Sequence, residues 1–143
     1  MTYATVEDLK AAIPERDLAL LTDRDGPVDS VDDGKLVNAL QDASAEIDGY
    51  ISKRVSLPIQ NPPRMLTVIC RDLAIYRLFL NTGSVPETTE KLRDGSIVYL
   101  RDVASGKISI GDDTPGEQVD TSPGAVLVSG DERTMTRDSL KGF

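Results

Sequence analysis

Residues 62–80 read PPRMLTVICRDLAIYRLFL and form the longest apolar run of the chain. The run predicts a helix, because Pro63 suits a first helical position and Asn81 and Gly83 follow as a stop signal. Apolar residues recur along it at helical steps on three neighbouring lines: Met65, Ile69, Leu73, Tyr76 and Leu80; Leu66 and Cys70; Val68, Ile75 and Phe79. We therefore expect a helix buried around most of its circumference, at the centre of a bundle or beneath a subunit contact.

This helix is not predicted to cross a membrane. Arg64, Arg71, Asp72 and Arg77 interrupt it, and its unbroken apolar stretches are much shorter than the ~20 residues that a span needs. We expect no membrane partner.

The composition predicts one small intracellular domain with an aliphatic core. The chain has 143 residues, 39% of them hydrophobic, and no tryptophan. Its formal net charge of -8 argues against a general nucleic-acid binder. The acidic surface fits either simple solubility or a wall that faces DNA without sticking to it. The single cysteine, Cys70, is expected to be a small buried hydrophobe, and the absence of a disulfide framework and a signal peptide predicts a reducing compartment.

Four further helices are expected around the central one. Capping and proline signals place them at about 5–13, 15–22, 32–55 and 86–105. The third has an apolar stripe, and Gly49 beside it is expected to allow close helix approach. The proline-rich segment 57–63 should turn the chain so that the central helix packs antiparallel to the preceding one. The stripes of the third and last helices are Leu36, Leu40, Ala43, Ile47, Tyr50 and Ile51, then Leu92, Ile97, Leu100 and Val103.

The chain beyond the helices changes character. Residues 107–111 alternate and predict a short strand. Residues 112–124 are rich in Asp, Pro, Gly, Ser and Thr, and predict an exposed arm; 125–129 regain strand character. The fold class is therefore mainly α, a small antiparallel helical bundle with short strand segments. Residues 1–111 form the helical domain, and 112–143 form an extended C-terminal arm.

The acidic loop 23–33 is weighed as a metal site. Its alternating carboxylates suggest a calcium loop, but the sixth and twelfth positions from Asp23 hold Val28 and Gly34 instead of Gly and Glu. Pro27 also occupies an expected ligand position. We therefore expect a turn with helix N-caps, and no metal.

An enzyme is not expected. The chain has no histidine, phosphate-binding loop, nucleophile elbow or zinc-ligand spacing. The pair Asp42 and Glu46 lies one helical turn apart on an exposed face, which favours simple solvation over acid–base catalysis. No catalytic residue, cofactor or metal ligand is assigned.

Several stretches together carry a family resemblance. None is a chemical signature alone, so the match rests on the ensemble: residues 3–9, 21–26, 43–51, 57–58 with Pro63, 70–78, 100–107 and the ending 136–143. Together they resemble a family of Mu-like bacteriophage and prophage proteins encoded among the head-morphogenesis genes. That family is similar to the helical head–tail connector (adaptor) proteins of long-tailed phages. Pro27 departs from the acid-rich spacing of relatives.

The resemblance implies a structural virion protein of the neck. Its copies are expected to form a ring, twelve-fold, under the portal protein, with DNA passing non-specifically through the middle. The other partner is a stopper or tail-completion protein. The protein is expected in the virion neck, and in the host cytoplasm during assembly.

Contacts with the portal or with neighbouring copies are expected at two places. Arg71, Asp72 and Arg77 of the central helix could act across such a contact, or form an ordinary ion pair with Asp42 or Glu46 of the preceding helix. In the arm, spaced apolar residues are expected to order against a neighbouring subunit: Val126, Val128, Met135, Leu140 and Phe143.

Two other functions remain as alternatives. Another neck protein, a stopper or tail terminator, would be mostly β, so the helix content discriminates it. A small DNA-binding regulator would need a basic recognition face on one helix, and no predicted helix has one.

Overall fold

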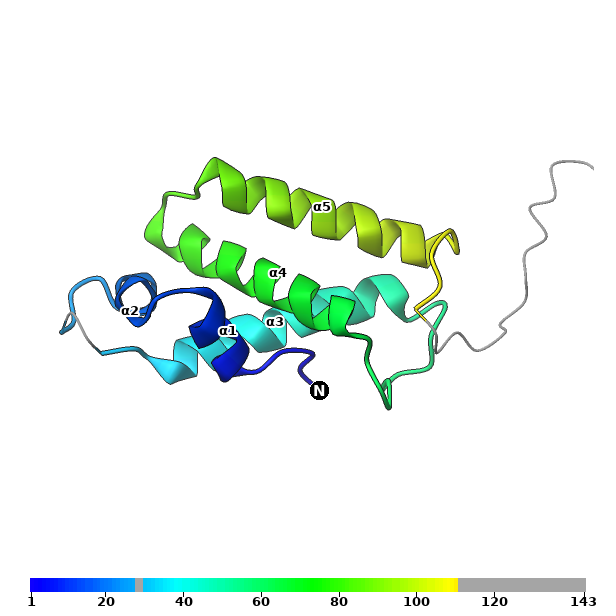
Figure 1. The fold of residues 1–143 in the computed structure, drawn as a ribbon, viewed down its shortest axis with the longest axis horizontal. Helices are drawn as coiled ribbons and strands as arrows, with labels where there is room; N and C mark the ends of the chain where they lie inside the picture. The colour runs from blue at the N-terminus through cyan, green and yellow to red at the C-terminus, as the bar shows by residue number, and fades with distance from the viewer. Residues whose placement is uncertain (28–29, 111–143) are drawn as a thin grey trace, which may run out of the picture.

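The computed structural model describes residues 1–27 and 30–110 as a mainly helical domain (Figure 1). The predicted arm at 112–143 and its strand at 125–129 lie outside the described residues. The prediction of a mainly α fold is confirmed. Five helices occur in the described part: α1 (Val6–Ala12), α2 (Glu15–Thr22), α3 (Asp33–Ile51), α4 (Arg64–Thr82) and α5 (Glu87–Ala104).

Three long helices make up most of the domain. The helices α3 and α5 each pack against α4 and also contact one another, while the short α1 and α2 pack against this group. The chain reverses direction between successive long helices, so α4 runs back along the other two (Figure 1). The predicted central helix therefore touches every other helix of the described domain.

Local signals explain where the helices begin and end. Thr5 caps α1: its side chain accepts from the Asp8 amide, and the Asp8 side chain accepts from the Thr5 amide in return. The Asp32 carboxylate caps α3 by accepting from the amides of Gly34 and Lys35. Gly83 ends α4 with a φ of 79°, a left-handed conformation that glycine adopts without steric cost.

The predicted boundaries need two adjustments. Pro63 is the N-cap of α4 and not its first residue. The helix α3 ends at Ile51, four residues before the predicted end, because the chain turns there and directs Val55 into the core, where it is 4% exposed.

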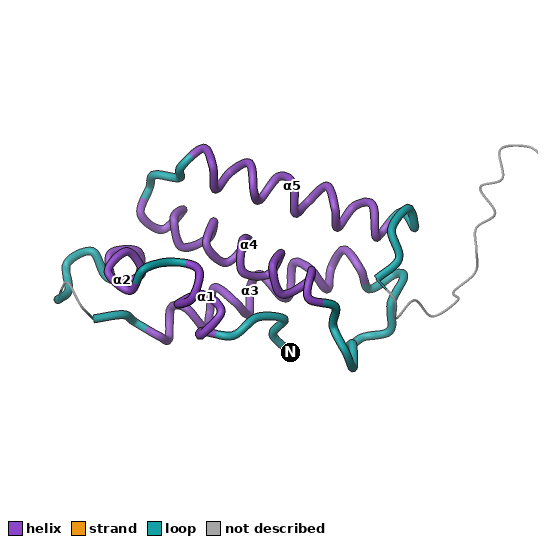
Figure 2. The backbone as a smooth tube through the Cα atoms, viewed as in Figure 1, coloured by secondary structure: helices purple, strands orange, loops and turns teal. Residues whose placement is uncertain are grey.

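No β-strand occurs in the described ranges; Figure 2 shows only helix and loop there. The predicted strand over 107–111 is therefore wrong for its described part, residues 107–110. Its alternation has another cause, since Ile110 is buried in the core and Ile108 packs against it from a loop. Burial of alternate residues in a loop can produce the same alternation in the sequence as a strand does.

The core is aliphatic, as expected, and the exposed apolar side chains of α4 lie near its two ends. Leu66, Ile69 and Leu73 are almost wholly buried, whereas Met65 is 42% and Leu80 51% exposed. Between Leu66 and Phe79 every residue of α4 is buried or partly buried, so the expectation that most of its circumference is buried holds there and fails only near the two ends of the helix.

Two smaller expectations about packing also fail. Leu92 is 57% exposed and belongs to the outer side of α5, while Ile97, Leu100 and Val103 are buried as expected. Gly49 is exposed, and a Cβ placed on it would meet nothing within 4 Å. Gly49 therefore does not serve a close helix approach. No helix in the described part is both long and apolar enough to cross a lipid bilayer.

Candidate functional site: an apolar groove

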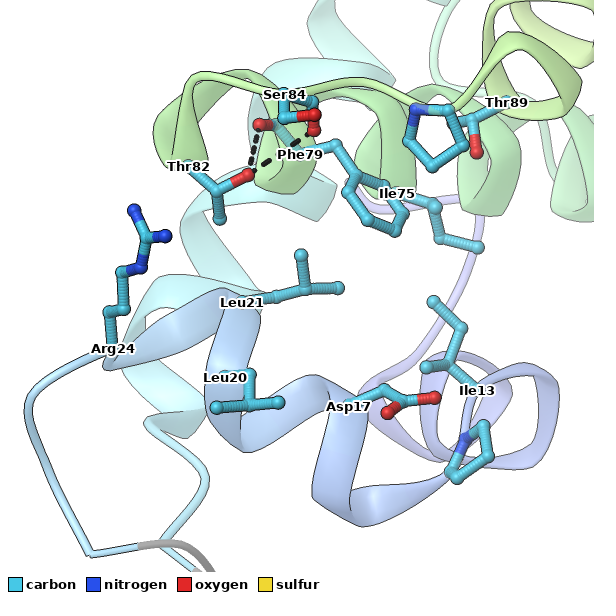
Figure 3. Close-up of a pocket in the computed structure, with 12 residues that line it drawn as sticks. Ile13, Asp17, Leu20, Leu21, Arg24, Ile75, Phe79, Thr82, Ser84 and Thr89 are labelled. Carbon is cyan, nitrogen blue, oxygen red and sulfur yellow. Dashed lines mark hydrogen bonds between the residues drawn. The ribbon is translucent and has the colours of Figure 1, made fainter.

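An apolar groove lies where α1 and α2 meet the end of α4 and the start of α5 (Figure 3). It has a volume of about 770 Å³. Ile13, Leu20 and Leu21 line it from the α1–α2 side, and Ile75 and Phe79 face them from α4. The rest of the lining comes from Pro14, Asp17, Arg24, Thr82, Ser84, Pro86 and Thr89.

The groove exists because the short helices α1 and α2 do not cover all of the apolar surface at the end of α4. In α2, Leu18 is completely buried and Leu21 is 9% exposed, so this side of the helix packs into the domain. Leu20 points to the other side and remains 47% exposed. On α4, Ile75 and Phe79 are only partly buried. The groove therefore presents branched and aromatic carbon surface to solvent.

Polar groups mark the ends of the groove and hold one wall. Asp17 lies beside Ile13 at one end, and Arg24 lies near Thr82 at the other (Figure 3). Both charged residues are exposed. The Thr82 hydroxyl donates to the Phe79 carbonyl at 2.7 Å, which fixes the last turn of α4 beside the groove. An apolar floor between two charged ends suits a peptide segment with apolar anchors better than a small polar substrate.

The predicted contact residues of α4 lie apart from this groove. Arg71 donates to Asp72 Oδ1 from Nε at 3.2 Å and from Nη2 at 3.1 Å. Arg71 also faces α1, where it lines a small pocket with Asp8. Arg77 points instead to α3 and pairs with Glu46 at 2.7 Å. The structure therefore does not bring Arg71 and Arg77 together.

This arrangement agrees with the ion-pair interpretation for Arg77, with Glu46 as the partner. Asp72 is 8% exposed, and its nearest cation is its chain neighbour Arg71. The other predicted contact residues, Val126, Val128, Met135, Leu140 and Phe143, lie outside the described residues. Their role stays a prediction.

The acidic loop has the turn and capping contacts that were expected of it. Asp23 accepts from the Asp25 amide at 3.3 Å, and Asp32 caps α3. Asp33 pairs with Lys10 of α1 at 3.0 Å. Across residues 1–27 and 30–110, no three His, Cys, Asp or Glu side chains gather as a metal site would require.

A small polar centre lies between α3 and α4. The Cys70 thiol is completely buried and lies 3.3 Å from the Ser44 hydroxyl. The same hydroxyl accepts from the Tyr3 amide at 3.2 Å, and the Tyr3 phenol donates to Asp48. Burial raises the pKa of the Cys70 thiol, and burial together with the Asp48 carboxylate raises the pKa of the Tyr3 phenol. We interpret this centre as structural, because each of these polar groups forms a hydrogen bond with another one.

The exposed leucine of the groove has a signal in the sequence. The 15–22 helix carries three leucines at 18, 20 and 21, and one face of so short a helix can bury only two of them. The surplus leucine, Leu20, marks the exposed lip of the groove.

Fold and site together define a small helical protein with an apolar groove on its surface. The sequence matches the model of the family described as "Bacteriophage Mu, Gp36" over residues 3–129. The chain belongs to this family.

Two relatives were found in phage and prophage genomes. The "Mu-like prophage FluMu protein gp36" of Haemophilus influenzae is 34% identical over 114 residues, which cover 80% of this chain and 79% of the relative. "Gene product J" of Escherichia phage Mu is 32% identical over 143 residues, which cover 100% of this chain and 99% of the relative.

Proposed function

We propose that this chain is a structural virion protein, the head–tail connector (adaptor) of a Mu-like phage. Its copies form a twelve-membered ring under the portal protein, and DNA passes through the ring without sequence-specific contacts. A stopper or tail-completion protein binds the other side of the ring. The protein acts in the virion neck after assembling from the host cytoplasm, and the proposal includes no catalytic step and no cofactor.

The proposal is supported chiefly by the fold: the chain belongs to the Mu Gp36 family, and its described part consists of helices and loops. The resemblance to adaptors implied a helical body, whereas stoppers and tail terminators are mostly β. The helical fold therefore favours the adaptor over these other neck proteins. Fold alone does not establish a function, so the position of the protein in the particle is what must be tested.

The surface of α4 supports contacts between copies. Met65 and Leu80, near its two ends, are large apolar side chains that this chain leaves about half exposed. A ring closes through heterologous contacts, in which one face of each copy meets a different face of the next. Apolar side chains left uncovered on the central helix are suited to such contacts.

The acidic surface supports passage of DNA instead of binding. The chain has a formal net charge of -8, and the helices of the described part have no concentrated basic face. Like charge lowers the affinity for the phosphate backbone. A gel shift at low salt is therefore expected to show no specific band; a specific band would support the DNA-binding regulator.

The decisive experiment compares phage particles made with and without this chain by electron cryomicroscopy. With it, we expect a ring beneath the portal into which the helices α3–α5 can be fitted. Without it, we expect DNA-filled heads that lack tails. Infectious tailed particles in the absence of the chain, or density for it elsewhere in the particle, would overturn the proposal.

A truncation after Gly111 tests the role of the arm in the same system. We expect a folded helical body, checked by circular dichroism, that no longer docks on portal-bearing heads. A truncated chain that still completes infectious particles would show that the arm is not needed for docking.

A further inference from the structure

We propose that residues 133–143 of the chain dock into the apolar groove of the same molecule. The groove has the form of a binding site for a short peptide segment, and in the described structure nothing covers Leu20 or the outer sides of Ile75 and Phe79. The inference concerns the free protein and does not depend on its position in a phage particle.

Charge selects this segment from the rest of the chain. Beyond residue 110 the sequence has three basic residues, Arg133, Arg137 and Lys141, and all of them fall within 133–143. Residues 111–132 contain six acidic residues and no basic one. The sequence is therefore divided into an acidic connecting stretch and a basic final segment.

Several acidic side chains lie in or near the groove, and their charge is opposite to that of the basic final segment. Asp17 lies in the groove, Glu15 precedes it in the first turn of α2, and Glu90 lies in the first turn of α5; Glu87 of the same turn already pairs with Lys91. Attraction between these opposite charges favours the final segment, while the acidic stretch before it is repelled by the same surface. Arg24 at the other end of the groove can pair with the single acidic residue of the segment, Asp138.

The final segment and the groove also match in their apolar side chains. The segment contains Met135, Leu140 and Phe143 among otherwise polar residues. The groove offers aliphatic and aromatic side chains to receive them, chiefly Ile13, Leu20 and Phe79. Burial of each large anchor favours docking through the hydrophobic effect, and the entropy cost of ordering the segment opposes it.

The connecting stretch has a suitable length. The described part of the chain ends at Ile110, which is buried. The segment that follows α5 lies at the opposite end of the domain from α2, which lines the groove (Figure 1). The helix α5, with 18 residues, separates the two ends, so the span is about 27 Å. Residues 111–132 would then form the connection, of 22 residues; the root-mean-square span of a coil of that length is about 23–28 Å.

This match of length and span favours the groove of the same molecule. The effective concentration of a tethered segment is highest when the root-mean-square length of the tether equals the distance to be bridged, and it reaches the millimolar range. A second copy of the chain at micromolar concentration competes poorly with such a tether. In the free protein the groove is therefore occupied in cis.

The test uses paramagnetic relaxation in the full chain. A nitroxide is attached at Ser139→Cys, with mass spectrometry confirming one label per chain because the native Cys70 is buried. In a chain that carries both the isotope and the nitroxide, we expect loss of the amide signals of Leu20, Leu21 and Phe79. In a mixture in which the two labels are on different copies, we expect these signals to be retained.

Matched variants separate docking from loss of fold. Leu20→Asp places a charge on the exposed lip of the groove, and we expect the lost signals to recover. Leu92→Asp makes the same change at an exposed leucine that does not line the groove, and we expect no recovery. Arg137→Glu in the segment should restore signal as well, whereas Arg101→Glu on the exposed surface of α5 should not.

Three results would overturn the inference. The first is full intensity of the groove amides in the doubly labelled chain. The second is signal loss in the mixed sample, which would assign the segment to a neighbouring copy. The third is signal loss that Leu20→Asp leaves unchanged, which would place the segment elsewhere on the domain. Circular dichroism of each variant confirms that the helices are intact.

Discussion

Arg77 Nη2 lies 2.7 Å from Glu46 Oε2, and this ion pair joins the middle of α3 to α4. The side chains are 36% and 23% exposed, so the pair is partly shielded from solvent. The Nε atom of Arg77 is buried without a hydrogen-bond partner in the described structure. Glu46 of the same chain therefore holds the Arg77 side chain against α3. An Arg77 that contributes to stability in this way is less available for a contact between copies.

A double-mutant cycle on Arg77→Ala and Glu46→Ala should give a coupling of about 0.5–1 kcal/mol in the free protein. The exposed pair Lys91–Glu87 is the control, since its side chains are 73% and 77% exposed, and its coupling should be smaller. Urea unfolding of the four chains of each cycle measures this. A coupling near zero for Arg77 and Glu46 would instead favour a role for Arg77 across copies.

The cap of α1 predicts a dependence of stability on pH. The Thr5 amide and hydroxyl both donate to Asp8, and these hydrogen bonds lower the pKa of the Asp8 carboxyl. A pKa that is lower in the folded than in the unfolded state stabilises the fold above the unfolded pKa. The contribution is lost as the pH falls through the folded pKa.

We therefore expect Asp8→Asn to cost about 0.5–1 kcal/mol at neutral pH. The difference from the unmodified chain should begin to shrink as the pH falls below about 4, the pKa of an unfolded Asp, and it should vanish once the carboxyl is protonated in the folded state as well. Asp42→Asn is the control, because Asp42 is an exposed carboxylate of α3 that caps no helix. Thermal unfolding between neutral and acidic pH measures the difference; a cost that stays constant across this range would contradict the assignment.

Two isoleucines of α4 should respond differently to a buried charge. Ile69 is fully buried in the core, so Ile69→Asp should unfold the domain, because no partner compensates the charge there. Ile75 lines the open groove and is only partly buried, so Ile75→Asp should keep the helical fold. Circular dichroism and the urea midpoint of both variants check this. Equal loss of structure in the two would show that the fold itself depends on an uncharged side chain at Ile75.

The Cys70 thiol should be unreactive while the domain is folded. It is completely buried, its pKa is raised by burial, and only the thiolate reacts with disulfide reagents. We expect no reaction with a thiol-specific chromogenic disulfide at slightly alkaline pH, and complete reaction after unfolding in guanidinium. A rapid reaction of the native protein would contradict the burial of this side chain between α3 and α4.

Local signals in the sequence were enough to locate the helices. Proline, glycine and acidic caps are read from neighbouring residues, and the boundaries near Thr5, Asp32, Gly83 and Pro86 agree with the structure to within a residue or so. The end of α3 was misplaced because no capping residue marks it. The chain leaves the helix there to bury Val55, which is a tertiary effect.

The groove could not be predicted in the same way. It depends on how two short helices meet the end of α4, and periodicity in one helix does not reveal what a neighbouring helix leaves uncovered. Ile75 and Phe79 were correctly recognised as apolar, but the sequence could not show whether the chain itself covers them. Likewise, the pattern of Arg71 and Arg77 could not distinguish a pair within the chain from a contact between copies.

The bond between the Tyr3 amide and the Ser44 hydroxyl has a consequence for hydrogen exchange. Amides near the start of a chain usually exchange with deuterium within moments, because such ends fray. Here the third residue is 6% exposed and donates to a side chain in the middle of α3. Its amide should therefore retain its proton as long as the central helices do, and the segment around Tyr3 should be released only when the whole domain opens.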